Sequence, residues 1–115
     1  MTRLILAAFA FACVVTSAHA QAQVGKASWY GAESGPRTAS GERFDPNGMT
    51  CAMRSYRRGQ QRSVRVTVLS TGRSAVCRVN DHGPAAWTGK IIDVSAGMAK
   101  VLGFYSAGVA KVRVE

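Results

Sequence analysis

Acidic residues are scarce in this sequence. Its 115 residues contain six Asp and Glu against fifteen Lys and Arg, a formal net charge of +9 at neutral pH. Because 47% of the residues are hydrophobic and only 18% are charged, the composition argues against a disordered polycation and predicts one packed domain. The basic excess leaves three classes of partner open: nucleic acid, an acidic membrane surface, or an anionic polymer outside the cell.

Long hydrophobic runs are absent except at the N-terminus. Residues 4–15 are apolar, follow a positive charge at Arg3 and precede Ala-His-Ala at 18–20, which is the pattern of a secretory signal peptide. The run is too short to span a bilayer as a mature helix, and no later run is as long, so we expect no stable membrane insertion. Cys13 lies in a poor lipobox inside this run, which favours an unlipidated product.

Export narrows the partners that the charge allows. Cleavage after Ala20 would leave fourteen basic and six acidic residues, a net charge of +8 outside the inner membrane. This argues against a nucleic-acid partner and favours an anionic polymer of the cell envelope. We expect a signal peptide at 1–20, a short polar lead at 21–25 and a single domain at 26–115.

Metal ligands and thiols are also few after residue 20. His82 is the only histidine there, so a metal site is poorly supported. Cys51 and Cys77 remain, and an even count in an oxidising compartment favours a disulfide. It would close a loop of roughly 26 residues and stabilise the fold by about 3–4 kcal/mol. The alternatives are two buried free thiols, or a Cys nucleophile paired with His82, although neither cysteine has an activating context.

Prolines are few and glycines many, three against twelve, which predicts short strands joined by tight turns. Residues 64–68 alternate between apolar and polar, a turn follows at 70–73, and the alternation resumes at 75–79, which predicts a β-hairpin. We expect further strands at the segments 90–94 and 110–114, with weaker candidates at 26–30 and 49–53.

One short helix is expected at Ala96–Leu102. Ser95 can cap its start, and Gly103 can take the left-handed conformation after its end. About six strands and one helix within about 90 residues predict a mainly β protein built as a compact barrel.

Few carboxylates could carry acid–base chemistry. Asp81 follows an alternating strand and precedes a Gly-Pro turn, a partly shielded but reachable place that suits a general acid. Alternatively, Asp81 is an Asx-turn residue that binds its own backbone. Asp93 lies between apolar neighbours, where it is either a second catalytic carboxylate or part of the cap of the following helix. Glu33 and Glu115 are expected to be solvated.

Several ordered blocks of the sequence resemble the RlpA family. They are residues 26–31 (Lys-Ala-Ser-Trp-Tyr-Gly), 38–45 (Thr-Ala-Ser-Gly-Glu-Arg-Phe-Asp), 64–67 (Val-Arg-Val-Thr), 72–74 (Gly-Arg-Ser), 78–84 (Arg-Val-Asn-Asp-His-Gly-Pro), 91–95 (Ile-Ile-Asp-Val-Ser) and 112–115 (Val-Arg-Val-Glu). The resemblance implies a six-stranded double-psi β-barrel. It also implies an exported bacterial protein of the periplasm or cell envelope that acts on peptidoglycan as a lytic transglycosylase, preferring glycan strands without stem peptides.

The resemblance assigns roles to single residues. Asp81 matches the family's essential aspartate, Glu42 its functional glutamate, and Asp93 an acid also found in the related expansin and endoglucanase barrels. The family's histidine falls on Met53, and methionine cannot transfer a proton. His82 stands where the family usually has arginine.

We therefore expect Asp81 to act as general acid and base on the MurNAc–GlcNAc β-1,4 bond and to leave 1,6-anhydro-MurNAc ends. Glu42 or Asp93 would stabilise the developing positive charge. Substrate-binding candidates are Trp29, Tyr30, His82 and Trp87, although Trp29 and Tyr30 could equally be core or rim residues. We expect a monomer without a cofactor. The alternative, suggested by Met53, is a non-catalytic, expansin-like module that binds cell-wall polysaccharide.

Overall fold

The computed structural model describes residues 7, 8, 10 and 22–115. The expected signal peptide, its cleavage site and Cys13 therefore lie outside the described residues, apart from residues 7, 8 and 10. No helix in the described part of the chain is long and apolar enough to cross a membrane.

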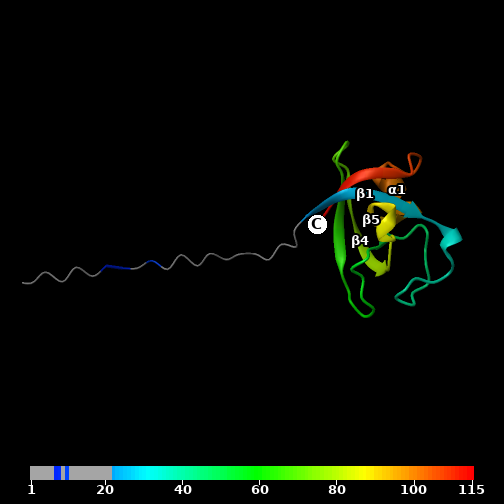
Figure 1. The fold of residues 1–115 in the computed structure, drawn as a ribbon, viewed down its shortest axis with the longest axis horizontal. Helices are drawn as coiled ribbons and strands as arrows, with labels where there is room; N and C mark the ends of the chain where they lie inside the picture. Colours follow the sequence, from blue (N-terminus) through cyan, green and yellow to red (C-terminus); the bar gives the residue numbers. More distant parts are fainter. Residues whose placement is uncertain (1–6, 9, 11–21) are drawn as a thin grey trace, which may run out of the picture.

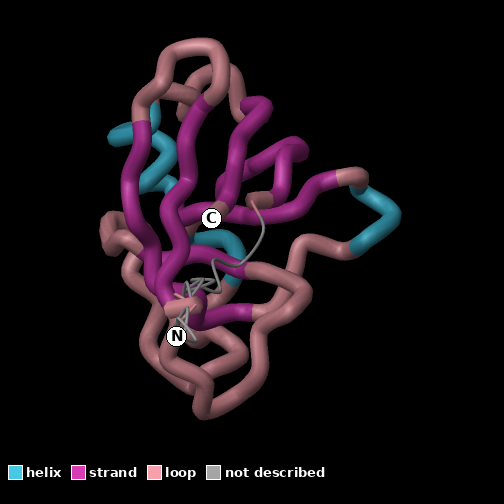
Figure 2. The backbone as a smooth tube through the Cα atoms, turned by 90° about the vertical axis from the view of Figure 1, so that its left-hand side faces the viewer, coloured by secondary structure: helices cyan, strands magenta, loops and turns pink. Residues whose placement is uncertain are grey.

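Six strands close into a barrel (Figures 1 and 2). They are β1 (Gln23–Tyr30), β2 (Thr50–Ala52), β3 (Ser63–Val68), β4 (Ser74–Asp81), β5 (Lys90–Ser95) and β6 (Val109–Val114). Their hydrogen-bonded order is β1-β5-β2-β4-β3-β6, and the pairs β1–β5 and β2–β4 are parallel while the others are antiparallel. The predicted mainly β barrel is confirmed.

The strands differ from the expected ranges mainly at the start of β1. This strand begins at Gln23, inside the segment expected to be a polar lead, because residues 23–25 pair with residues 112–114 of β6. The pairing with β6 thus makes β1 longer than the alternation of apolar and polar residues in its own sequence would predict. The C-terminus consequently lies beside the start of β1 (Figure 1).

The helix α1 (Ala96–Leu102) has the expected bounds and caps. The Ser95 hydroxyl accepts the backbone N–H of Met98 at 3.2 Å, and Gly103 adopts a left-handed φ of 83°. Gly97 lets α1 approach the loop after Phe44, because a Cβ at this position would lie 2.7 Å from the Cα of Asn47. The helix is therefore packed directly against this loop.

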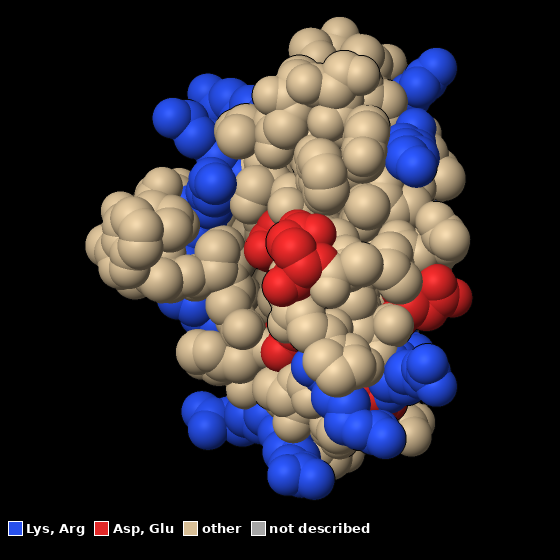
Figure 3. Space-filling view, turned by 90° about the vertical axis from the view of Figure 1, so that its right-hand side faces the viewer, with Lys and Arg blue, Asp and Glu red and all other residues tan. Residues whose placement is uncertain are grey.

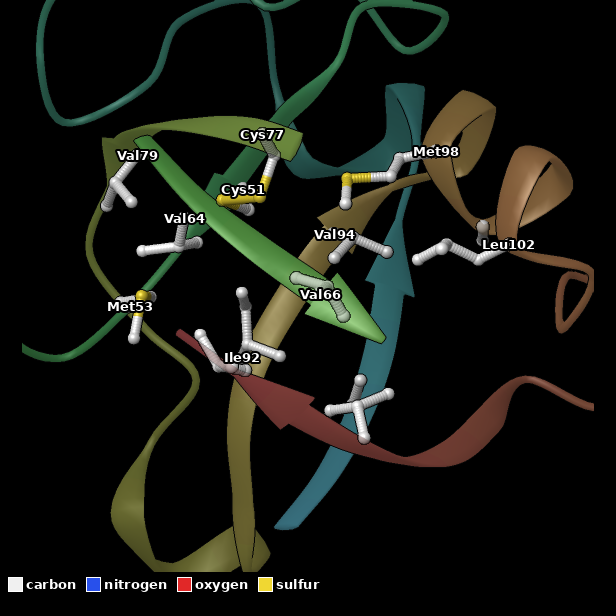
Figure 4. Close-up of a cluster of buried hydrophobic side chains, with 14 of the residues drawn as sticks. Cys51, Met53, Val64, Val66, Cys77, Val79, Ile92, Val94, Met98 and Leu102 are labelled. Carbon is white, nitrogen blue, oxygen red and sulfur yellow. A yellow bond between two sulfur atoms is a disulfide. The ribbon is translucent and has the colours of Figure 1, made fainter. Parts of the chain in front are cut away.

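The barrel interior is one continuous apolar core that contains the disulfide (Figure 4). Cys51 on β2 and Cys77 on β4 are bonded, with their Cα atoms 5.9 Å apart, and both are fully buried. The predicted disulfide is confirmed. A second, smaller cluster consists of Tyr30, Phe44 and Ala52 and lies outside the main core.

Candidate active site

Asp81 and Asp93 meet on neighbouring strands around β2. Ala52, the last residue of β2, pairs with Asp81 of β4 on one side and with Asp93 of β5 on the other. Two strand spacings place the Cα atoms of the two aspartates roughly 10 Å apart, with a small alanine between them. The two carboxyl groups thus border one hollow of about 270 Å³. Its other lining residues are Tyr30, Ser34, Ala52, His82, Gly83, Pro84 and Ala85.

The Asp81 carboxylate is held by one of its two oxygens. Oδ1 accepts the backbone N–H groups of Ala39 and His82, each at 2.9 Å. The second donor is His82, directly after Asp81. In an Asx turn the donor would be Gly83, so Asp81 does not form an Asx turn. No described residue donates a hydrogen bond to Oδ2, so this oxygen can face a ligand in the hollow.

Asp93 is partly buried. Its Oδ1 accepts the Ser28 hydroxyl at 3.0 Å, and burial raises the pKa of the Asp93 carboxyl above its ordinary value. The hydrogen bond from Ser28 and the charge of Lys90 oppose this rise, while the charge of Asp81 adds to it. Asp93 does not cap α1, because the Ser95 hydroxyl has that role. The Asp93 carboxyl group is therefore available to interact with a ligand in the hollow.

Replacing Asp93 by asparagine is expected to stabilise the protein increasingly as the pH rises. Because its folded-state pKa is raised, the contribution of Asp93 to stability is most favourable below the ordinary pKa of about 3.9 and is lost as the pH rises through the folded-state value. Asp93→Asn removes that loss. Urea unfolding of both proteins between about pH 3 and pH 7 measures the difference.

Ser28→Ala is the matched control for Asp93→Asn. It removes the hydrogen bond that lowers the pKa of Asp93, so its pH-dependent loss of stability should be larger than that of the wild type. Identical pH profiles for all three proteins would show that Asp93 is not perturbed by burial.

Tyr30 offers a ligand in the hollow its hydroxyl group rather than the face of its ring. The ring stacks on Phe44 with a centroid distance of 4.8 Å, and the side chain is buried. Its hydroxyl finds no hydrogen-bond partner among the described residues. Burial, followed by the charge of Asp81, raises the pKa of Tyr30, so the hydroxyl stays protonated. It is available as a neutral donor to a ligand in the hollow.

The two tryptophans lie apart from each other. The Trp29 indole stacks on Tyr105 at 4.4 Å and donates its N–H to the Tyr105 carbonyl at 3.0 Å, and it does not line the hollow. Trp87 lies on the short helix η2 (Ala86–Thr88) and is 88% exposed. It follows Ala85 of the hollow by two residues, which leaves Trp87 free to stack on a sugar ring outside.

Glu42 does not join the two aspartates. Its carboxylate forms a bidentate ion pair with Arg78, with 2.9 Å between Oε2 and Nη2. The hydrogen bond from Arg78 is the main cause that lowers the pKa of Glu42, so the carboxylate stays charged. Glu42 lines a different cavity, beside the loop that supplies Ala39 to Asp81.

The side chain of Met53 belongs to the barrel core (Figure 4). It is 4% exposed and does not line the hollow, although its backbone N–H donates to the Asp81 carbonyl at 3.1 Å. The Met53 side chain therefore lies away from the hollow between the two aspartates.

The surface charge is unevenly distributed on the face shown in Figure 3. Acidic side chains gather near its middle, and Lys and Arg side chains lie toward its edges. Within the described residues, no group of three or more His, Cys, Asp or Glu side chains could hold a metal ion.

Comparison with known proteins points to one family. The family model described as lytic transglycolase matches residues 22–114. A probable endolytic peptidoglycan transglycosylase RlpA of Nostoc sp. is 50% identical over 94 residues, covering 79% of this chain and 24% of the relative. The endolytic peptidoglycan transglycosylase RlpA of Pseudomonas aeruginosa is 43% identical over 102 residues, covering 88% and 29%. The chain therefore spans about a quarter of the length of these relatives.

Solved structures show the same fold at low identity. The Streptomyces papain inhibitor matches with a TM-score of 0.61 and 22% identity, covering 81% of this chain and 92% of the inhibitor. A mutant of the Clavibacter michiganensis expansin in complex with cellohexaose matches with a TM-score of 0.61 and 18% identity, covering 83% and 50%. Together with the family model, these matches confirm the predicted double-psi β-barrel.

Proposed function

The chain belongs to the lytic transglycolase family, and on that premise we propose that it cleaves peptidoglycan glycan strands as a lytic transglycosylase. The observation that carries this proposal is the pairing of Ala52 with both Asp81 and Asp93, which brings two carboxyl groups in unlike environments to one hollow. Two carboxyl groups are the usual minimum for breaking a glycosidic bond.

Asp81 is the proposed general acid and base. Two backbone N–H groups hold Oδ1, so a proton on Oδ2 can be delivered to the glycosidic oxygen between MurNAc and GlcNAc. As that C–O bond breaks, the C6 hydroxyl of MurNAc attacks its own C1 and returns a proton to Asp81. The products are a 1,6-anhydro-MurNAc end and a free GlcNAc hydroxyl, and no water is consumed.

Asp93 is the proposed charge-stabilising group. It lies across Ala52 from Asp81, where its ionised form would face the oxocarbenium-like carbon. Glu42 is paired with Arg78 outside the hollow, so we give it a positioning role through the loop that contacts Asp81. Tyr30 would donate a hydrogen bond, and His82 and Trp87 would contact the sugars beside the hollow.

Product analysis tests this proposal. Purified protein incubated with glycan strands stripped of stem peptides should yield 1,6-anhydro ends, detected by mass spectrometry as fragments one water lighter than hydrolysis products. Strands that carry stem peptides should react more slowly. Hydrolysis products alone would overturn the transglycosylase mechanism, and retained binding to sacculi with no product would favour the expansin-like binding module.

Met53→His is expected not to raise the activity. The side chain at this position packs in the barrel core, so an imidazole there would be buried away from the hollow and destabilise the fold by about 1–3 kcal/mol. Activity per folded molecule should match that of the Met53→Leu control. A rise in activity for Met53→His alone would show that the missing histidine limits catalysis, as the binding-module alternative requires.

A further inference from the structure

A second cavity of about 410 Å³ adjoins the hollow along β4. Its lining residues are Ser40, Glu42, Tyr56, Gly59, Gln60, Gln61, Arg78, Val79 and Asn80. Asn80 directly precedes Asp81, and the β2–β4 pairing skips from Val79 to Asp81, which leaves Asn80 as a bulge residue. A bulge interrupts the alternation of side chains and re-aims them.

One loop connects the two cavities. Ala39 donates its backbone N–H to the Asp81 carboxylate, and Ser40 donates its own to the Asn80 carbonyl at 3.2 Å. The Asn80 side chain also helps to lower the pKa of Glu42 by a hydrogen bond, after the larger contribution of Arg78. The side chains of Asn80 and Asp81 therefore both contact this loop, and a glycan bound at Asp81 would pass close to the second cavity.

Two buried polar atoms, on residues that line this cavity, have no partner in the described part of the chain. They are Oδ1 of Asn80, whose side chain is 3% exposed, and the hydroxyl of Tyr56, which is 9% exposed. Buried polar groups are almost always hydrogen-bonded, so two orphans that line one cavity indicate a missing ligand. Oδ1 of Asn80 is an amide oxygen, so it can take part in a hydrogen bond only as an acceptor.

The chemistry of the lining selects the ligand. The Arg78 and Glu42 charges neutralise each other, so neither a free anion nor a free cation is favoured. Asn80 offers an acceptor and Tyr56 a hydroxyl donor, which together match a group that has one N–H and one C=O. The Tyr56 ring supplies apolar surface for a methyl group. A secondary acetamide has these three features.

We propose that this cavity binds the acetamido group of an N-acetylated amino sugar, with Asn80 accepting its N–H and Tyr56 donating to its carbonyl. The inference rests on the proposed function, because it places a neighbouring sugar of the strand that is cleaved at Asp81. Asn80 and Tyr56 are then specificity-determining residues that make the enzyme sensitive to the acetylation state of the glycan.

Tyr56→Phe tests the assignment, because it removes only the hydroxyl. On N-acetylated glycan strands, we expect KM to rise about tenfold with little change in kcat, as for the loss of one substrate hydrogen bond. On chemically de-N-acetylated strands, the wild type should already be weak and the variant should match it. Tyr105→Phe, whose hydroxyl lies elsewhere on a half-exposed side chain, is the matched control and should behave as the wild type.

A binding measurement separates this inference from the proposed function. The NMR titration of the protein with a tetramer of N-acetylglucosamine, compared with a tetramer of glucosamine, should shift the Asn80 side-chain amide only with the acetylated sugar. The same acetyl-dependent shift, weakened by Tyr56→Phe, in a protein without cleavage activity would support the cavity and overturn the enzyme. Cleavage that is indifferent to acetylation and to Tyr56→Phe would overturn the cavity and leave the enzyme standing.

Discussion

Asp81→Asn should lower kcat/KM on denuded glycan strands by about 10²- to 10⁴-fold, the usual contribution of a general acid. An asparagine oxygen can still accept the N–H groups of Ala39 and His82, so the local structure should persist. Only the transferable proton on the second oxygen is lost, because an amide nitrogen takes its place. Initial rates of formation of 1,6-anhydro ends measure the effect, and thermal unfolding checks the fold.

Asp45→Asn is the matched control for Asp81→Asn. The Asp45 carboxylate likewise accepts a backbone N–H, that of Asn47 at 2.9 Å, but it does not line the hollow. The same chemical change there should leave the rate within about twofold of the wild type. If both variants retained activity, Asp81 would not transfer the proton.

Asp93→Asn decides which carboxyl group donates. Burial raises its pKa, so it is the other carboxyl group of the hollow that could donate the proton. With Asp81 as the acid, Asp93→Asn should leave a measurable residual rate. A larger loss for Asp93→Asn than for Asp81→Asn would exchange the two roles.

Local patterns in the sequence predicted most of the fold. The alternation at 64–68, the turn at Gly72 and the Ser95 cap are each set by residues adjacent in the chain, and the structure has them where the sequence placed them. The start of β1 was missed, because its first residues are held by β6 from the far end of the chain. Strand residues that are held by a partner strand distant in the sequence cannot be recognised from the local periodicity of side chains.

The same limit applies to the candidate site. Asp81 and Asp93 could be named from their flanking residues, but their meeting depends on Ala52, whose small side chain and two pairings are features of the closed barrel. The ion pair of Glu42 joins residues 36 positions apart, and the orphaned hydroxyl of Tyr56 gives no signal in the sequence. Asn80 gave no signal either, because a polar residue at this position continues the alternation of residues 75–79.

Replacing both Cys51 and Cys77 by alanine should lower the free energy of unfolding by about 3–4 kcal/mol. The disulfide closes a loop that spans 26 positions, and its loss enlarges the entropy of the unfolded chain. Alanine is preferred to serine here because both side chains are fully buried, and a hydroxyl would lack a partner. Urea unfolding of the variant and of the wild type, with and without reductant, measures the loss.

The disulfide should also matter for the site, because β2 is only three residues long and carries Ala52 directly after Cys51. Without the bond, β2 is held by its short pairings with β4 and β5 alone, so activity should fall at temperatures where the fold is still largely intact. Reduction of the wild type should reproduce both losses, whereas reductant should leave the double-alanine variant unchanged. A wild type whose unfolding midpoint is insensitive to reductant would show that the bond contributes nothing to stability.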